Sequence, residues 1–293
     1  MNNFEIATGT VVGRDHRKIG KNNQDAYYLR VNQDSIIGIV SDGCGSAKYS
    51  ETGAQLLVRL CGNTLNRYLE LLRKHLDSGE GLADYWSLIQ EKMLLELSKI
   101  ALALGFNLKK IISNYLLATI LGFVVTQEKT IIFSIGDGEA FLNGSLIKSG
   151  SFPGNAPPYF AFLLLDKSSR PFCKQMLNFS VDKIIETKKI ETLLIGTDGV
   201  EELRKRAKDN IPGKKTVVGD ISEWWKNDKY FFNKDAIRRQ LFMINSYVVK
   251  ARYAKNGQIQ KVERFSGLLR DDTSMIVLRR KIGGGLIGDC DKK

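Results

Sequence analysis

The sequence has few of the residues that build disulfide frameworks or zinc sites. It contains four cysteines and two histidines in 293 residues. Cys44, Cys61, Cys173 and Cys290 show no CxxC spacing, so neither a disulfide framework nor a zinc cluster is supported. Any metal that this chain binds must therefore be held by oxygen atoms.

Long apolar runs are also absent. The longest candidates, residues 116–125 and 160–165, fall short of the roughly 20 apolar residues that a membrane helix requires. Residues 1–5 lack the basic segment and apolar run of a secretory signal. We therefore expect a soluble, cytoplasmic protein with no membrane partner.

Basic residues exceed acidic ones. The chain has 44 Lys and Arg against 32 Asp and Glu, a formal charge of +12. Such a field could attract nucleic acid, an anionic membrane or a phosphorylated partner. No nucleic-acid-binding motif accompanies the charge and the basic residues are scattered, so we expect a solvated basic surface, no nucleic-acid partner and a monomer.

The apolar residues indicate an α+β domain. Residues 54–72 and 85–104 have helical periodicity, with Ser50 as the expected N-cap and Gly79 and Gly81 between the two helices; a third helix is predicted over residues 234–253. Strands are predicted at 5–12, 26–31, 35–40, 118–125, 130–135, 191–195 and 273–278. Strands and helices come in separate blocks, which favours layered, mainly antiparallel sheets. We expect one domain over residues 1–282, irregular or inserted segments at 150–158, 205–229 and 255–268, and a flexible tail at 283–293.

Acidic residues recur at the ends of the predicted strands. Asp42, Asp137 and Asp198 each follow a strand and precede a glycine, whereas Asp25 and Asp271 stand just before strands. In an antiparallel sheet the end of one strand lies beside the start of its neighbour. All five carboxylates can therefore meet at one edge. A single Asp-Gly is more often a turn, but three copies with two acidic strand starts favour a shared site.

Carboxylates that lie close together need a cation to offset their repulsion. Like charges within about 4–6 Å raise one another's pKa and oppose folding. Magnesium and manganese prefer oxygen ligands and reverse the sign of that interaction. Two such ions roughly 3.5–4 Å apart can share a carboxylate, lower the pKa of a bridging water and clamp a phosphoryl group.

Several motifs resemble the metal-dependent protein serine/threonine phosphatases of the type 2C (PPM) family, in their bacterial form. They are residues 23–26 (Asn-Gln-Asp-Ala), 39–45 (Ile-Val-Ser-Asp-Gly-Cys-Gly), 118–119 (Ala-Thr), 135–140 (Ile-Gly-Asp-Gly-Glu-Ala), 193–200 (Leu-Leu-Ile-Gly-Thr-Asp-Gly-Val) and 270–274 (Arg-Asp-Asp-Thr-Ser). Their order matches the family over most of the chain.

The resemblance implies an αββα sandwich of two mainly antiparallel sheets, two or three Mn²⁺ or Mg²⁺ ions, and a phosphorylated protein substrate with a possible partner kinase. Asp42 would bridge two ions, which Asp198, Asp271 and the Gly43 carbonyl would complete. Asp137 with Asp198 would form a third site, and Asp25 would hold metal-bound water. The nucleophile would be solvent, so Asp25, Asp42, Asp198 and Asp271 are the predicted catalytic residues.

Two departures from the family motifs stand out. Gln24 replaces a Glu at the second metal, which removes one negative charge. The phosphate-binding Arg is replaced by Gly20, which leaves Lys21, Arg17 and His16 as candidate substrate-binding residues, with His16 also a candidate general acid. The apolar loop at 152–160 stands where the family has a mobile flap, and either shapes the substrate cleft or packs as an ordinary loop.

Because of these departures a second hypothesis stays open: a weakly active or inactive phosphatase-like module that binds a phosphorylated or kinase partner. A phosphohydrolase with an aspartyl nucleophile is disfavoured because Asp-x-Asp is missing at the strand ends. A Ser-His-Asp hydrolase is disfavoured because the GxSxG motif is missing.

Overall fold

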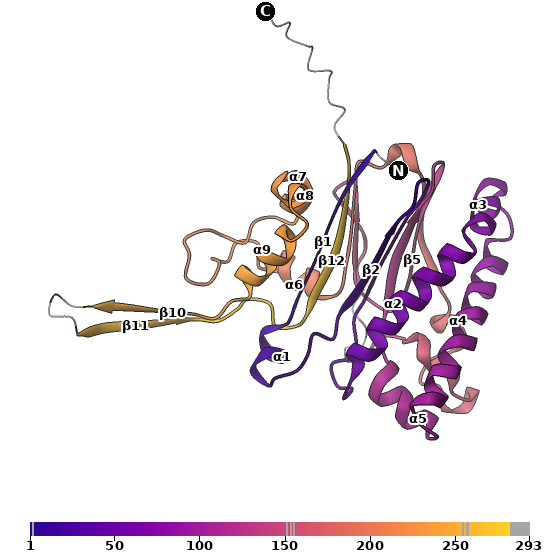
Figure 1. The fold of residues 1–293 in the computed structure, drawn as a ribbon, viewed down its shortest axis with the longest axis horizontal. Coiled ribbons are helices and arrows are strands. Elements are labelled where there is room, and N and C mark those ends of the chain that lie inside the picture. The colour runs from indigo at the N-terminus through magenta and orange to yellow at the C-terminus, as the bar shows by residue number, and fades with distance from the viewer. Residues whose placement is uncertain are drawn as a thin grey trace, which may run out of the picture.

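The computed structural model describes residues 1, 3–150, 152, 154, 156–253, 255 and 258–281. Two five-stranded antiparallel sheets lie face to face (Figure 1). The first has the order β1 (Phe4–Val11), β12 (Thr273–Arg280), β9 (Thr192–Gly196), β6 (Glu139–Leu142) and β7 (Ser145–Lys148). The second has the order β2 (Ala26–Val31), β3 (Ile36–Ser41), β4 (Ile120–Val125), β5 (Lys129–Ile135) and β8 (Ser180–Glu186).

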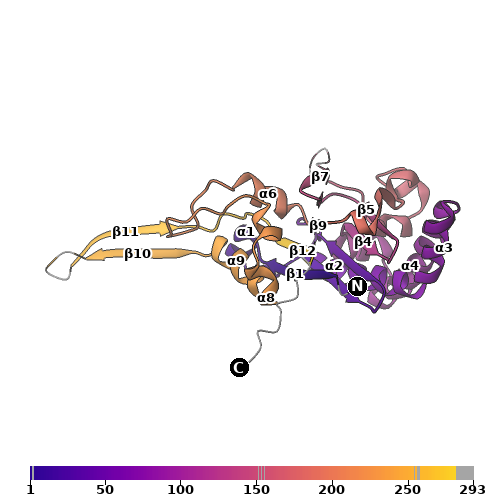
Figure 2. The same ribbon diagram turned by 90° about the horizontal axis from the view of Figure 1, so that it is seen from above.

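Helices cover the outer face of each sheet (Figures 1 and 2). The second sheet carries α2 (Ser50–Arg67), α3 (Leu69–Ser78), α4 (Leu82–Leu104) and α5 (Leu108–Ile111). The first carries α6 (Gly199–Lys205), α7 (Glu223–Lys226), α8 (Lys229–Phe232) and α9 (Ala236–Ile244). A short helix, α1 (Arg14–Lys18), follows β1. Of the helices in the described part of the chain, none has both the length and the apolar character that a membrane span needs.

The central strands are apolar on both faces, which explains the layers. On β12, Met275 and Val277 pack under the helices of the first sheet, whereas Ile276 and Leu278 face the other sheet. On β3, Ile37 and Ile39 pack under α2 and α4, and Ile36 faces the sheet interface. Side chains alternate across a strand, so one sequence fills two cores. The predicted αββα sandwich is confirmed.

The third predicted helix, residues 234–253, is wrong in its second half. Helix α9 ends at Ile244, and Val248–Tyr253 forms β10, which pairs with β11 (Ile259–Phe265) in a separate two-stranded sheet. Apolar residues in segment 248–253 also alternate with polar ones, so the sequence fits a strand as well as a helix. The segment is mostly exposed, so a pattern of buried positions does not distinguish strand from helix. The expected insertion at 255–268 is therefore mainly a strand.

Other predictions need smaller corrections. Residues 205–229 are less peripheral than expected, because Trp224 and Trp225 of α7 are buried in the core of the first sheet. The first long helix breaks at Tyr68, and Ser50 is its first residue and makes no capping hydrogen bond. Gly79 ends α3 in a left-handed conformation, as expected of a separator. The predicted tail at 283–293 lies outside the described residues.

Candidate metal centre

Asp42 lies at the end of β3, where three segments come into close contact. Its backbone N–H donates to Thr119 Oγ1 at 3.1 Å, and the Thr119 N–H donates to the Asp42 carbonyl at 2.9 Å. The N–H of Gly43 donates to the Gln24 carbonyl at 3.1 Å. A Cβ at Gly43 would stand 2.7 Å from the Gln24 carbonyl oxygen and 2.8 Å from that of Ser50. The glycine after Asp42 is therefore needed for close approach of the chain.

Asp25 is held by the opposite sheet. The hydroxyl of Thr197 donates to Asp25 Oδ2 at 2.6 Å and accepts from the N–H of Ser274 at 3.0 Å. The Asp25 N–H donates to Asn23 Oδ1 at 3.1 Å, which fixes the turn before β2. One threonine hydroxyl thus links β9, β12 and the start of β2, next to Asp198.

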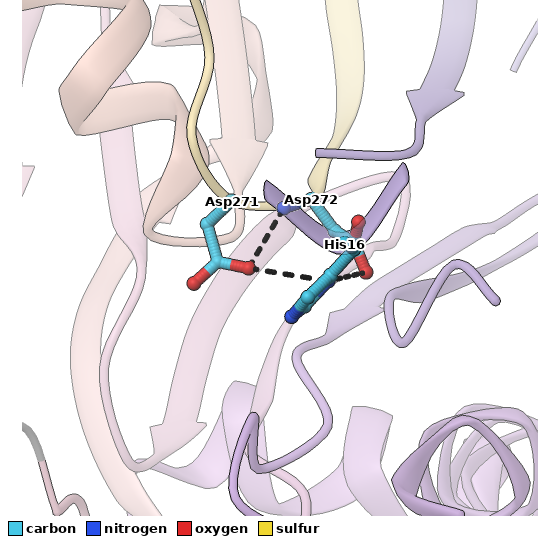
Figure 3. A group of neighbouring side chains, drawn as sticks. All are labelled: His16, Asp271 and Asp272. Atoms are coloured by element: carbon cyan, nitrogen blue, oxygen red, sulfur yellow. Dashed lines mark hydrogen bonds and ion pairs between the residues drawn. The ribbon is translucent and has the colours of Figure 1, made fainter. Parts of the chain in front are cut away.

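Two adjacent acids at the start of β12 have different surroundings (Figure 3). The side chain of Asp272 is 1% exposed, and its oxygens accept from the N–H groups of Gly13 at 2.6 Å and Gln24 at 2.5 Å. The side chain of Asp271 is 45% exposed and, among the described residues, accepts only a local bond, from the Asp272 N–H at 2.8 Å. Asp272 therefore joins chain segments, whereas Asp271 is free to bind a ligand.

His16 of α1 lies against these two acids. Its Nδ1 is 3.1 Å from Asp272 Oδ2 and 3.7 Å from Asp271 Oδ1, without hydrogen-bond geometry to either. One ligand atom from each of the three residues falls within 4.8 Å of the others. Both oxygens of Asp272 already accept backbone bonds, so a cation here would compete with the bonds that hold the loops together.

The carboxylates repel one another in a buried setting. Burial raises the pKa of Asp25 and of Asp42 well above the usual value, and repulsion from Asp272 and from Asp198, respectively, adds to it. Burial, followed by repulsion from Asp271 and Asp137, raises the pKa of Asp198 to about 7. Burial raises the pKa of Asp137 to about 6. All five acids predicted from the strand ends therefore act on one another.

Several side-chain oxygens near the strand ends have no hydrogen-bond partner in the described part of the chain. Gln24 Oε1, Asp25 Oδ1, Asp137 Oδ1 and Asp198 Oδ1 are buried and unpaired. A buried acceptor without a partner costs about 1–3 kcal/mol, and more when it is charged. Hard divalent cations bind such oxygen donors and offset their repulsion. The donor set therefore fits Mg²⁺ or Mn²⁺.

The comparisons with known proteins agree with this geometry. A sequence model of the family described as protein phosphatase 2C matches residues 12–230. The chain belongs to the protein phosphatase 2C family. The predicted resemblance is confirmed, and the protein is a serine/threonine phosphatase.

Solved phosphatase structures share the fold of this phosphatase. A crystal structure of a bacterial serine phosphatase has 15% identity and a TM-score of 0.51, covering 95% of this chain and 98% of that one. The serine/threonine phosphatase Stp1 from Staphylococcus aureus has 16% identity and a TM-score of 0.50, covering 95% of each chain. The S. agalactiae serine/threonine phosphatase has 14% identity and a TM-score of 0.50, covering 95% of this chain and 100% of that one. No curated protein sequence matches the chain.

The phosphatase has a cavity of about 440 Å³ beside the acids. Its lining includes His16, Asp198 and Asp271, together with two cations, Lys205 and Arg270. Neither cation was predicted from the sequence. Two signals could have found them, because Arg270 directly precedes Asp271 and Lys205 lies seven residues, or two helical turns, after Asp198.

The predicted substrate-binding residues of the phosphatase have different positions. Lys21 Nζ donates to the Gly45 carbonyl at 2.6 Å, in the loop that follows Asp42. Arg17 instead donates to the Asn245 carbonyl at 2.9 Å, with its guanidinium 5.7 Å from the centre of the Phe242 ring on α9. The structure therefore brings together the five acids, Gln24 and His16, but it does not direct Arg17 toward them.

The flap predicted at residues 152–160 lies partly outside the described residues, because Pro153 and Asn155 are not described. Tyr159, near its end, is buried, and its pKa is raised mainly by burial, with the charges of Asp42 and Asp137 contributing. This end of the loop therefore borders the acids. A flap that shapes the cleft stays a prediction.

We predict that the metal-free phosphatase loses stability as the pH rises. Asp137 and Asp198 have higher pKa values when folded than when unfolded, so between about pH 4 and 7 the folded state binds more protons. Stability falls with pH wherever the folded state binds more protons, by up to about 1.4 kcal/mol per pH unit for each carboxyl. Thermal unfolding in EDTA should therefore show a midpoint several degrees lower at pH 8 than at pH 5.5.

Two controls accompany this measurement. In the variant with Asp137→Asn and Asp198→Asn, the decline should be clearly shallower, because two of the titrating groups are gone. Added Mn²⁺ should raise the midpoint of the unchanged protein more at pH 8 than at pH 5.5. An equally steep decline in the double variant would contradict the assignment of these two carboxyls.

Proposed function

We propose that this phosphatase hydrolyses phosphoserine and phosphothreonine in proteins with the aid of two or three Mn²⁺ or Mg²⁺ ions. The observation that supports it best is the set of buried, unpaired oxygens on Gln24, Asp25, Asp137 and Asp198. When bound, such ions supply a water molecule of lowered pKa and neutralise charge on the phosphoryl group. A signalling role and a partner kinase stay predictions from the family resemblance, and a cytoplasmic location stays a prediction from the sequence.

The proposed ligand roles follow from the position of each acid. Asp42 is subject to repulsion from four other acids, Asp25, Asp137, Asp198 and Asp271, which suits a carboxylate shared between two ions. Asp198 and Asp271 would complete the first ion site, with Gln24 and the Gly43 carbonyl at the second. Asp137, which interacts with Asp198, would hold a third.

The remaining groups position the reactants and handle protons. The hydroxyl of Thr197 fixes one oxygen of Asp25 and leaves the other to accept a hydrogen bond from the attacking water. His16, the histidine among the cavity residues, would give a proton to the departing seryl or threonyl oxygen. Because solvent attacks phosphorus, we expect no covalent phosphoenzyme.

The alternative of an inactive binding module has no support. Gln24 retains an oxygen that is buried and unpaired, so it can still serve as a ligand. Lys205 and Arg270 also line the cavity, where they pair with Glu201 at 2.9 Å and with Asp15 at 3.5 Å, and we expect them to act in place of the missing phosphate-binding Arg. In this proposal both departures from the family motifs have substitutes.

We predict that Asp42→Asn, Asp198→Asn and Asp271→Asn each lower kcat for para-nitrophenyl phosphate by about a thousandfold or more, because charge stabilisation of the transition state is lost. Hydrolysis would be measured with manganese present, and chelator should abolish it in the unchanged protein. Asp77→Asn, at an exposed position of α3, is the matched control and should keep full activity. A folded Asp198→Asn or Asp271→Asn variant with normal turnover would contradict the assigned roles.

We predict that Gln24→Glu tightens manganese binding about tenfold, since it adds a negative charge to the ligand set. Isothermal titration with Mn²⁺ would measure the change. The same substitution should lower the unfolding midpoint of the metal-free protein, because it adds repulsion to the cluster. Unchanged affinity would mean that the Gln24 side chain does not reach the ion.

We predict that Arg270→Ala and Lys21→Ala raise KM for para-nitrophenyl phosphate several-fold, because each removes a cation near the phosphate position. Arg17→Gln should leave KM unchanged, since Arg17 contacts α9 and its neighbouring carbonyls. Steady-state kinetics on the three folded variants would measure each KM and show which of these cations contact the substrate. A KM that rises only in Arg17→Gln would reverse the assignment.

A further inference from the structure

The two-stranded sheet formed by β10 and β11, here called the ribbon, projects from the body of the molecule (Figures 1 and 2). Within the described residues, neither strand pairs with a third. An isolated hairpin is at best marginally stable in water because it buries little apolar surface. The ribbon therefore presents two free edges, and its faces are mostly exposed beyond its base, where Val248 and Lys250 lie close to Gly213.

One face of the ribbon is apolar and exposed. Residues directly opposite each other in the register share a face, which places Val249, Ala251, Tyr253, Ile259 and Val262 on one side, with Arg264 beside them opposite Val249. Val249 is 52% exposed, Tyr253 65%, Ile259 60% and Val262 42%. A contiguous apolar face of this kind on a projecting element is typical of an interaction site.

The other face is basic. Arg252 and Lys261 lie directly opposite each other, and Lys250 lies opposite Glu263. Like charges across a ladder destabilise the pairing. Glu263 offsets part of this repulsion, at 2.7 Å from Lys261 and 3.9 Å from Arg252. Between residues 248 and 265 there are five Lys and Arg against one Glu, so the excess charge is positive.

The ribbon is connected directly to the candidate metal centre. Five residues, 266–270, separate the end of β11 at Phe265 from Asp271. Within them, the Gly267 carbonyl accepts from Arg14 Nη1 at 3.2 Å, and the Leu269 carbonyl accepts from the Arg14 N–H at 2.8 Å. The base of the ribbon is thus fixed to α1, which carries His16. A chain bound to the ribbon would be held beside the active site.

We propose that the ribbon is a docking arm for the phosphoprotein substrate, and that it binds an acidic segment with alternating apolar side chains. Such a segment would add a strand to a free edge, lay its apolar side chains along Val249 and Val262, and place its carboxylates near Arg252 and Lys261. This inference rests on the proposed function, because the bound segment belongs to the substrate.

Charge and composition favour this occupant over others. A second copy of the ribbon would add a second excess of positive charge, which opposes association. Nucleic acid would match the charge, but among the described residues of the apolar face only Tyr253 is aromatic, so bases find little stacking surface there. An acidic protein strand matches both faces at once.

Three synthetic phosphothreonine peptides test the proposal. Each joins the same phosphorylated site through a Gly-Ser linker to a tail, which is Glu-Val-Glu-Ile-Glu-Val-Glu, Lys-Val-Lys-Ile-Lys-Val-Lys or Glu-Ser-Glu-Ser-Glu-Ser-Glu. Compared with the untailed peptide, the first tail should raise kcat/KM about tenfold by increasing the local concentration of substrate. The basic tail should give no gain, and the serine tail a smaller one.

Two ribbon variants locate the effect. Arg252→Gln with Lys261→Gln removes the opposed cations, and Val249→Thr with Val262→Thr removes apolar surface but keeps strand propensity. Both should abolish the gain from the first tail while leaving para-nitrophenyl phosphate hydrolysis unchanged. Lys109→Gln with Lys110→Gln, exposed residues of α5 far from the ribbon in Figure 1, is the charge-matched control and should keep the gain.

The outcomes separate this proposal from the proposed function. No hydrolysis of para-nitrophenyl phosphate by the unchanged protein would refute the phosphatase activity itself. Normal hydrolysis with equal kcat/KM for all tails would overturn the docking arm alone. So would a dimer in sedimentation that dissociates in the Val249→Thr, Val262→Thr variant. A third result would also overturn it: no tail changes kcat/KM, but a labelled oligonucleotide or phosphatidylserine vesicles bind, and this binding needs Arg252 and Lys261. The ribbon would then be a site for nucleic acid or for membrane lipid.

Discussion

Repulsion among buried carboxylates is the constraint on which this structure depends. The strand ends that carry the acids form what is here called the active edge. Four of its acids, Asp25, Asp42, Asp137 and Asp198, have raised pKa values, and for each the main cause is burial, with charge repulsion adding to it. Without a cation, the ionised cluster opposes the fold that contains it. The rest of the molecule must supply enough stability to hold these groups together, and three apolar cores on and between the two sheets do so. Metal binding and folding stability are therefore thermodynamically linked in this phosphatase.

The edge is held together by groups that are not themselves proposed ligands. Thr119 fixes the backbone of Asp42, Thr197 fixes the carboxyl of Asp25, and Asp272 binds the N–H groups of Gly13 and Gln24. Neutral hydroxyls can do this without adding charge to the cluster. Asp272 does add charge, but its oxygens accept hydrogen bonds from backbone donors. Adjacent residues in the sequence, Asp271 and Asp272, thus serve different purposes.

The active edge could be predicted from the sequence because strand periodicity and the Asp-Gly repeats act together. Each repeat placed an acid at the end of a buried strand, and antiparallel pairing brought those ends to one edge. The contacts of Arg17 could not be predicted, because α9, which it packs against, lies more than 200 residues away in the sequence. The ribbon was missed for another reason. Its residues are exposed on both faces, so burial imposed no pattern that would distinguish strand from helix.

The residues around the acids help to interpret both departures from the family motifs, Gln24 and Gly20. A glutamate at position 24 would add another charge beside Asp25, whose pKa is already raised by burial and by neighbouring acids. Glutamine keeps a ligating oxygen and lowers this repulsion, at the expense of cation affinity. The phosphate-binding role that Gly20 cannot fill passes in our proposal to Lys21, Lys205 and Arg270, whose positive charges also lie near the cluster. Only the glutamine reduces net negative charge at the edge, because the exchange of Arg for Gly20 removes a positive charge. Gln24 thereby stabilises the metal-free state relative to the family pattern, and the enzyme depends more on cation concentration for activity.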